Sequence, residues 1–127
     1  MKSFFLNIIT VTVVGLLTLT SCNSKKAHEG KYAGTMPCAD CEGIYTEIQL
    51  DGNNYTIKQV YKGKGDEAQN TFTEKGTYTW DQNKHIVTLN GDEAWSYRVG
   101  DGTLIALDMY GNEVTGDLAD MYILRKK

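Results

Sequence analysis

The sequence predicts an all-β domain, in the form of a small antiparallel barrel in which each strand pairs with its neighbour. From residue 30 to 127, polar and apolar residues alternate with a period of two, and no window sustains apolar recurrence at helical spacing. Connections are short, so consecutive strands are expected to pair, although a two-sheet sandwich uses similar strands. The barrel is favoured because large aromatics with a polar tip, which suit a narrow interior, occupy the expected inward positions: Tyr55, Tyr61, Tyr78, Trp80, Trp95 and Tyr97. These residues are expected to form core, with a cavity for an apolar ligand as the alternative.

Residues 1–21 are typical of a secretory signal that is removed from the mature protein. Lys2 precedes the mostly apolar run Phe4–Leu19, which is too short and too rich in threonine for a membrane span. The run ends in Leu19-Thr20-Ser21-Cys22, which resembles the lipobox of bacterial lipoproteins. That resemblance implies cleavage before Cys22 and a lipid anchor on this residue. The alternative is an ordinary signal peptide followed by a stray cysteine, an odd leftover in an exported protein.

Residues 22–29 are polar and unpatterned, and we interpret them as a flexible tether between the lipidated Cys22 and a single domain at 30–127. Position 23 is Asn rather than Asp. By resemblance to the sorting rule of enteric lipoproteins, this residue argues against retention in the inner membrane. We therefore expect an outer-membrane protein, and we also expect its domain to face the periplasm.

The charge balance argues against a nucleic-acid partner. The formal net charge is −3 at pH 7, and removal of Lys2 with the signal makes it more negative. No basic patch is visible, so neither nucleic-acid binding nor polybasic contact with a membrane surface is expected.

About nine short strands are expected along the domain. In the clearest of them, Ile44, Thr46, Ile48 and Leu50 share one face, and the turn at residues 51–54 follows. The charged stretch 62–69 is expected to be a mobile loop. The expected strands are Lys31–Thr35, Ile44–Leu50, Tyr55–Lys62, Thr71–Thr73, Gly76–Trp80, His85–Leu89, Trp95–Val99, Thr103–Asp108 and Met121–Arg125. The expected core draws on Ile44, Ile48, Tyr55, Tyr78, Trp80, Trp95 and Leu107.

Cys38 and Cys41, at the mouth of the first long strand, form the pattern that carries chemistry. A thioredoxin-like redox role is disfavoured, because the carboxylates of Asp40 and Glu42 oppose thiolate formation and no helix follows. A disulfide is typical of an exported chain, yet so short a loop would add little stability by chain entropy.

Metal binding is the third interpretation of the pair. Two thiolates suit Cu(I), and Met36 offers a thioether as a third soft ligand. Three such ligands are too few for a closed structural zinc site. His28, in the expected tether, could swing toward the cysteines, whereas His85 is interpreted as an ordinary strand residue. The disulfide and the Cu(I) site remain alternatives at this point.

The motif Tyr32-x-Gly34-x-x-Pro37-Cys38-Ala39-Asp40-Cys41-x-Gly43-Ile44-x-Thr46 resembles the N-terminal domain of the NlpE family of outer-membrane lipoproteins. Two later blocks fit the same resemblance: Gly76-Thr77-Tyr78 and Gly102-x-Leu104-x-x-Leu107-Asp108-x-x-Gly111-Asn112. The resemblance spans about Tyr32 to Leu124. It implies a lipocalin-like antiparallel barrel, a link to copper resistance and envelope-stress signalling, and metal binding at Cys38 and Cys41. Two-domain members carry a second, OB-like domain with its own cysteine pair. We expect a single-domain member here and do not carry over roles tied to that domain, such as sensing of oxidative folding.

No arrangement typical of an enzyme is visible in the sequence. The acidic residues scatter over turns and outward strand positions, and as a set we interpret them as solvated surface. Two functions remain: a copper-responsive lipoprotein that binds metal or signals to an envelope-stress sensor protein, and a lipocalin-like periplasmic carrier of a small apolar ligand. A filled barrel would favour the first function, and an open apolar cavity the second.

Overall fold

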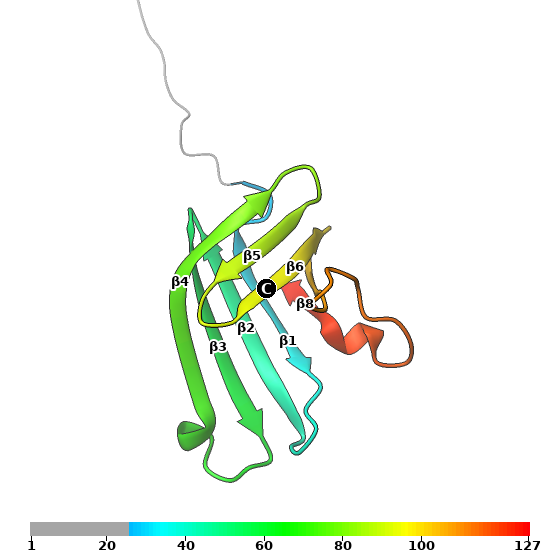
Figure 1. The fold of residues 1–127 in the computed structure, drawn as a ribbon. Coiled ribbons are helices and arrows are strands. Elements are labelled where there is room, and N and C mark those ends of the chain that lie inside the picture. The colour runs from blue at the N-terminus through cyan, green and yellow to red at the C-terminus, as the bar shows by residue number, and fades with distance from the viewer. Residues whose placement is uncertain (1–25) are drawn as a thin grey trace, which may run out of the picture.

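Residues 26–127, the part of the chain that the computed structural model describes, form a closed antiparallel barrel in which every strand pairs with the next and β8 returns to β1 (Figure 1). The barrel expected from the alternation is therefore confirmed. The signal segment, its lipobox and Cys22 lie outside the described residues. The strands are β1 Gly30–Met36, β2 Gly43–Asp51, β3 Asn54–Lys62, β4 Thr71–Asp81, β5 Ile86–Asn90, β6 Ala94–Gly100, β7 Thr103–Ala106 and β8 Ile123–Lys126.

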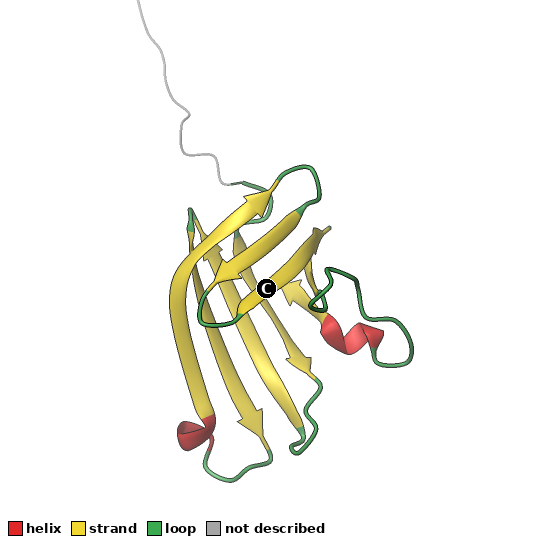
Figure 2. Ribbon diagram, viewed as in Figure 1, coloured by secondary structure: helices red, strands yellow, loops and turns green. Residues whose placement is uncertain are grey.

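In residues 26–127, helical structure is limited to two 3-10 turns in the connections (Figure 2). The turn η1, Glu67–Asn70, lies in the stretch expected to be a mobile loop, and the Asp66 carboxylate caps it by accepting a hydrogen bond from the Ala68 N–H at 3.0 Å. The turn η2, Ala119–Tyr122, leads into β8. From residue 26 to the end, no helix is long and apolar enough to cross a membrane.

The prediction of two separate strands at Thr71–Thr73 and Gly76–Trp80 was wrong, because β4 runs without a break through Gly76. Gly76 lies beside Tyr55 on β3, and a Cβ placed there would come within 2.8 Å of the Tyr55 ring. The glycine therefore makes room for a buried aromatic ring and does not start a turn. With this correction, about nine expected strands become the eight of the barrel.

The inward face of the strands forms one hydrophobic core. The face predicted for β2 is confirmed at Thr46, Ile48 and Leu50, which are all buried. The prediction that Trp95 belongs to the core was wrong, since its side chain is 44% exposed. The buried cluster draws on residues between 32 and 124, from the first strand to the last. Its members are Tyr32, Ile48, Leu50, Tyr55, Ile57, Tyr78, Val87, Leu89, Tyr97, Leu104, Ala106 and Leu124.

One end of the barrel, here called the closed end, is covered by the segment Lys26–Glu29, part of the expected flexible tether. The side chain of His28 is only 3% exposed and stacks on Trp80 with ring centroids 4.2 Å apart. Its Nε2 lies 3.2 Å from the Tyr78 hydroxyl. That hydroxyl donates to the Gly52 carbonyl at 2.6 Å, so it accepts the second hydrogen bond from Nε2–H. His28 thus attaches this part of the expected tether to the domain, while Lys26 and Ala27 are exposed.

The opposite end, here called the open end, is incomplete on one side. β4 pairs with β5 only along Tyr78–Asp81, while it pairs with β3 along Thr71–Thr77. β1 pairs with β8 only at Tyr32 and Ala33. Past the β5–β6 turn the barrel therefore continues as a four-stranded sheet, β1 to β4, whose inner face is only partly covered (Figure 1).

Candidate functional site

The cysteine pair lies in the loop that joins β1 to β2 at the open end. The two strands pair as far as Met36 and Ile44, and residues 37–42 turn the chain between them. Cys38 and Cys41 form a disulfide, with their Cα atoms 5.4 Å apart. Just past it, the Glu42 N–H donates to the Lys62 carbonyl at 3.0 Å, which ties the end of the loop to β3. Of the two alternatives, this structure shows the oxidised pair.

The loop carries an acidic residue between the sulfurs. One oxygen of Asp40, Oδ2, lies 3.1 Å from the Lys64 ammonium, and the other, Oδ1, lies 3.4 Å from Cys38 Sγ. The latter is a contact and not a hydrogen bond, because a disulfide sulfur carries no hydrogen. The Asp40 side chain is 75% exposed, so its ion pair with Lys64 is well solvated and contributes little stability. Its local effect is to place a cation beside the carboxylate nearest the sulfurs.

The potential metal ligands are brought together in part. Across residues 26–127, the single group of three or more His, Cys, Asp or Glu side chains with metal-ligand spacing is Cys38, Asp40 and Cys41, whose ligand atoms lie within 4.8 Å of one another. Asp40, which the sequence argument treated only as a neighbouring charge, thus joins the two cysteines. The donor set fits a soft cation only in the reduced state, since the disulfide has no thiolate to offer.

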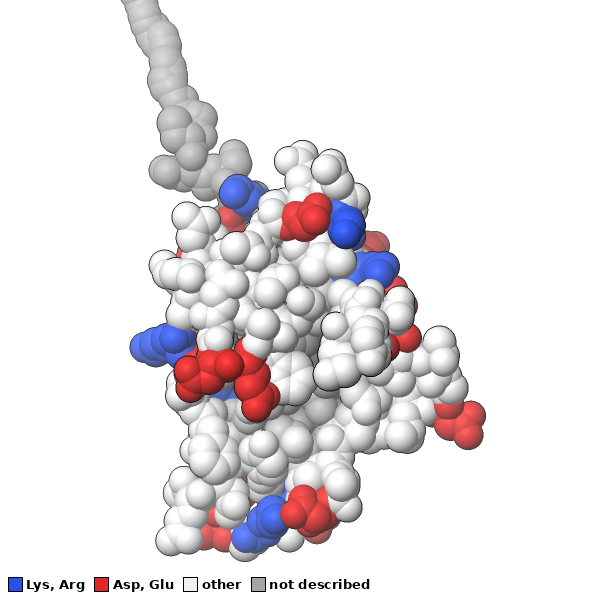
Figure 3. Space-filling view, in the orientation of Figure 1, with Lys and Arg blue, Asp and Glu red and all other residues white. Residues whose placement is uncertain are grey.

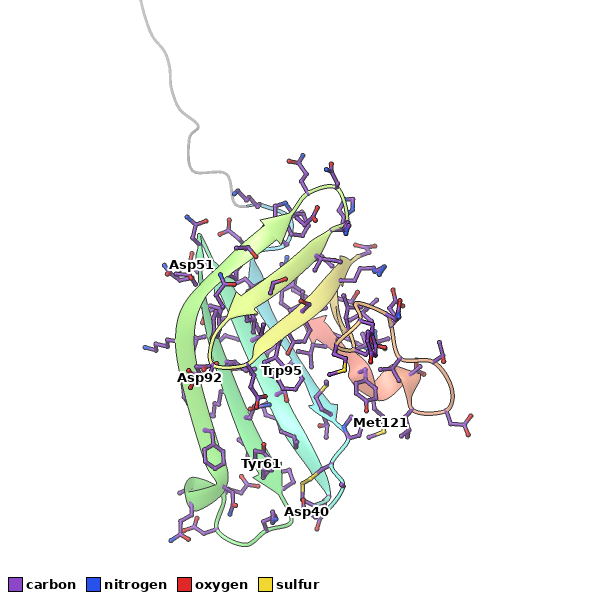
Figure 4. The ribbon with its side chains drawn as sticks, in the orientation of Figure 1. Asp40, Asp51, Tyr61, Asp92, Trp95 and Met121 are labelled. Carbon is purple, nitrogen blue, oxygen red and sulfur yellow. A yellow bond between two sulfur atoms is a disulfide. The ribbon has the colours of Figure 1, made fainter. Side chains whose placement is uncertain are left out.

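The other expected ligands lie elsewhere. Met36 packs against the barrel core and lines a cavity with Pro37. His28 does not approach the cysteines, because it is buried at the closed end, while Asp40 lies at the open end (Figure 4). His85 is exposed in the turn before β5, with its ring edge-on to Trp80.

A cavity of about 350 Å³ opens next to the cysteine loop. We call it the apolar chamber. Most of its wall is hydrocarbon or aromatic, and Tyr97 at its base belongs to the core. It is lined by Met36, Pro37, Ile44, Thr46, Gln59, Trp95, Tyr97 and Tyr122.

A second cavity, of about 240 Å³, lies beside the first, and we call it the acidic vestibule. It shares Gln59 and Trp95 with the apolar chamber. Sequence reasoning missed this site because its carboxylates come from β4 and from the β5–β6 turn, and the acidic residues were interpreted as a set as solvated surface. The vestibule is lined by Ile57, Gln59, Phe72, Thr73, Glu74, Asp92, Glu93 and Trp95.

Comparison with known proteins gives one family and several relatives. The model of the NlpE N-terminal domain matches residues 32–117. Lipoprotein NlpE of Escherichia coli (strain K12) is 28% identical over 122 residues, which cover 84% of this chain and 51% of that protein. The chain therefore spans about half the length of this curated relative.

Two solved structures are also similar. The crystal structure of a candidate lipoprotein from Shewanella oneidensis has 43% identity and a TM-score of 0.69, with coverage of 78% of this chain and 88% of that one. The crystal structure of the Cpx pathway activator NlpE from Escherichia coli has 28% identity and a TM-score of 0.60. In that case the coverage is 69% of this chain and 46% of the other.

Proposed function

Because the chain belongs to the NlpE N-terminal domain family, we propose that it is an outer-membrane lipoprotein of copper homeostasis or envelope-stress signalling, with Cys38 and Cys41 as its reactive site. One observation carries the proposal: the two sulfurs and the Asp40 carboxylate lie together in a loop at the open end, outside the core. Supporting this, the core contains neither cysteine, so a change in their oxidation state need not unfold the barrel.

The chemistry begins with reduction of the disulfide. A dithiol reductant supplies two electrons and two protons, the S–S bond breaks, and Cys38 and Cys41 become thiols while the reductant becomes a disulfide. The thiols must then lose their protons to act as ligands, so metal affinity is expected to fall in acid. Cu(I) would be held by two thiolates, with the Asp40 carboxylate adding a favourable charge. Met36 remains the proposed third ligand, and its thioether would have to leave the apolar chamber to serve.

The signalling part of the proposal concerns a partner protein. The Escherichia coli relative is described as a Cpx pathway activator, and this chain matches about half of it. We propose that this chain also contacts an envelope-stress sensor protein. The Cys38–Cys41 loop contacts β3 through Lys62 and forms an ion pair with Lys64. A change in its oxidation state would therefore alter the surface that the sensor contacts at the open end.

Competition for Cu(I) tests the metal site. Residues 23–127, which contain the whole core, are reduced and titrated with Cu(I) against a chromophoric chelator, after circular dichroism has confirmed the fold. Wild-type protein should take one equivalent of copper, while oxidised protein and the Cys38→Ser, Cys41→Ser variant should take none. Met36→Leu, which keeps the volume of the side chain, should weaken binding only if the thioether is a ligand. Equal competition by the reduced wild-type and double-serine proteins would show that the copper site is not in this loop.

Lipid anchoring at Cys22 is the proposed means of attachment to the outer membrane. The intact mass of the membrane-extracted protein should correspond to a chain that starts at Cys22 and carries acyl groups. A Cys22→Ala variant should be found in the soluble periplasmic fraction. A wild-type protein that begins at another residue and lacks acyl mass would contradict the anchor.

A second function, the lipocalin-like carrier of a small apolar ligand, is favoured by the apolar chamber. The barrel is filled at its closed end and open at the other, so the structure holds a feature of each alternative. The chamber, at about 350 Å³, is more than twice the size of an apolar cavity of about 150 Å³ that suffices to bind benzene. Binding of decyl-chain probes, described in the following subsection, tests this function.

A further inference from the structure

The apolar chamber and the acidic vestibule together form a site of two halves that meet at Trp95 and Gln59. Trp95 lies on β6 at the rim of this opening. Its side chain is 44% exposed, although a large aromatic residue at an inward position is usually buried. Phe72, on the facing edge of β4, is 55% exposed and packs edge-on against Tyr61 with ring centroids 5.5 Å apart. Two large aromatic side chains thus flank an opening and are left in contact with water.

The fold places the carboxylates of the vestibule on one side of this opening. Glu74 is on the part of β4 that extends past β5, opposite Ile57, at an inward-facing position. Asp92 and Glu93 come from the turn between β5 and β6, which lies directly over it. Gly91 permits that approach, because a Cβ there would come within 2.5 Å of the Tyr55 hydroxyl and 2.8 Å of a Glu74 oxygen. Acidic side chains gather beside the hollow on this face (Figure 3), with Asp92 and Trp95 at the same opening (Figure 4).

The carboxylates of this group form no ion pair with the neighbouring side chains that the structure describes. In the described part of the chain, none of the ion pairs involves Glu74, Asp92 or Glu93. Glu74 is oriented instead by a neutral donor, the Tyr55 hydroxyl, at 2.9 Å. Burial, the hydrogen bond to Glu74 and the charges of Glu74 and Asp92 raise the pKa of Tyr55 to about 12. Two carboxylates therefore act on one buried hydroxyl, as expected if the vestibule holds a negative potential.

This arrangement selects for a positive ligand group. The carboxylates would repel an anion. A neutral apolar group would displace water from the carboxylates without offering a hydrogen bond or an opposite charge in return. An ammonium or guanidinium group would gain both the carboxylates and the face of an exposed indole or phenyl ring. A fully hydrophilic cation would leave the apolar chamber filled only with water, so the ligand also needs an apolar part.

We propose that the open end of the barrel binds cationic amphiphiles, with the positive group in the acidic vestibule and the apolar part in the apolar chamber. The inference rests on the second candidate function, the carrier, and narrows its ligand from any apolar molecule to one that carries a positive charge. The charge preference is separate from the copper site, because no vestibule residue belongs to the Cys38–Cys41 loop. The apolar chamber, by contrast, shares Met36 with the proposed copper site.

Three probes with one decyl chain and different head groups test the charge preference: decyltrimethylammonium, decyl sulfate and decyl maltoside, each below its micelle concentration. The protein is residues 23–127 in the oxidised state, with Trp80→Phe so that Trp95 is the remaining tryptophan and its fluorescence reports binding. The cationic probe should bind about tenfold tighter than decyl maltoside, and salt should reduce the difference by screening. Decyl sulfate should bind most weakly.

Matched variants locate the site. Asp92→Asn with Glu93→Gln removes two charges from the vestibule without changing shape, and should remove most of the preference for the cationic probe. Asp101→Asn with Asp117→Asn removes the same charge from exposed positions that line neither cavity, and should leave the preference unchanged. Ile44→Phe, which narrows the apolar chamber without adding a tryptophan, should weaken all three probes about equally. Each variant is first checked for native β-type circular dichroism.

The outcomes separate the inference from the function on which it rests. Equal binding of all three probes would leave the carrier in place and overturn the charge preference. No binding of any probe by folded protein would overturn both. A preference that survives Asp92→Asn with Glu93→Gln would place the cationic site elsewhere, and would overturn the assignment of the vestibule.

Discussion

The imidazole of His28 lies stacked on the indole of Trp80, with their ring centroids 4.2 Å apart and their planes 22° from parallel. This contact attaches the segment before β1 to the closed end of the barrel. Burial, with a smaller effect from Lys26, holds the pKa of His28 below its ordinary value of 6.5, and the nearby Glu29 opposes this only in part. A neutral imidazole is thus the form that the folded protein prefers.

Stability should therefore fall in mild acid through His28. The unfolded chain takes up its proton near pH 6.5 and the folded chain only at lower pH, so the free energy of unfolding decreases as the pH drops from 6.5 toward the folded value. Chemical denaturation from pH 7.5 to 5 should show this slope in wild-type protein and a shallower one in His28→Gln. His85→Gln, which replaces the exposed histidine, should keep the wild-type slope. Parallel curves for wild type and His28→Gln would contradict the prediction.

Removal of the disulfide should leave the barrel folded. Cross-linking so short a loop restricts the unfolded chain little, so the Cys38→Ser, Cys41→Ser variant should lose about 2 kcal/mol in free energy of unfolding. Urea denaturation of the variant, and of reduced wild-type protein, measures the loss. An unfolded double variant at room temperature would show that the loop has a greater structural role than its position outside the core indicates.

Truncation in the core should be far more costly than truncation at the surface. Ile48 has no exposed surface and belongs to the buried cluster. Ile48→Ala should lower the free energy of unfolding by about 2–5 kcal/mol, through lost burial and a residual cavity. Leu118→Ala, at a position that is 51% exposed, should change it by less than about 0.5 kcal/mol. Similar losses in both variants would contradict the assigned core.

Close packing under the β5–β6 turn should make Gly91 sensitive to a single added methyl group. Gly91→Ala would bring a Cβ against the Tyr55 hydroxyl and Glu74, and should cost about 1–3 kcal/mol. Tyr55→Phe removes the hydroxyl, so in a double-mutant cycle the combined variant should lose less than the sum of the single variants. An additive result would mean that the strain at Gly91 does not involve Tyr55.

The period-two pattern was enough to predict the strands because it reflects the geometry of the pleat. The buried face at Thr46, Ile48 and Leu50 needed nothing beyond alternation. Gly76 misled the prediction because glycine suits a turn and also suits a strand position crowded by a neighbouring ring. The difference depends on Tyr55, which is distant in sequence and adjacent only in the fold.

The candidate site was less predictable, because it depends on where the barrel is incomplete. Trp95 alternates like a core residue and pairs with Leu89 on β5, yet β7 ends at Ala106, opposite Tyr97, and Trp95 is left 44% exposed. The polar segment that includes His28 carried no signal of burial, since its partners Tyr78 and Trp80 lie on β4. The cysteine spacing restricted the chemistry to a few alternatives, but the oxidation state is set by solution conditions that a sequence does not encode.

The two ends of the barrel face in opposite directions, and this has a consequence for what can meet the protein. The segment Lys26–Glu29 lies at the closed end (Figure 1). The disulfide, the apolar chamber and the acidic vestibule lie toward the other end. Strands such as the nine-residue β2 separate these ends by about 30 Å. If the lipid proposed at Cys22 keeps the closed end toward the membrane, the reactive end lies roughly one domain length away from the bilayer surface. Reductants, copper and amphiphiles would then arrive from the aqueous compartment, and hydrophobic molecules still dissolved in the membrane would be out of reach.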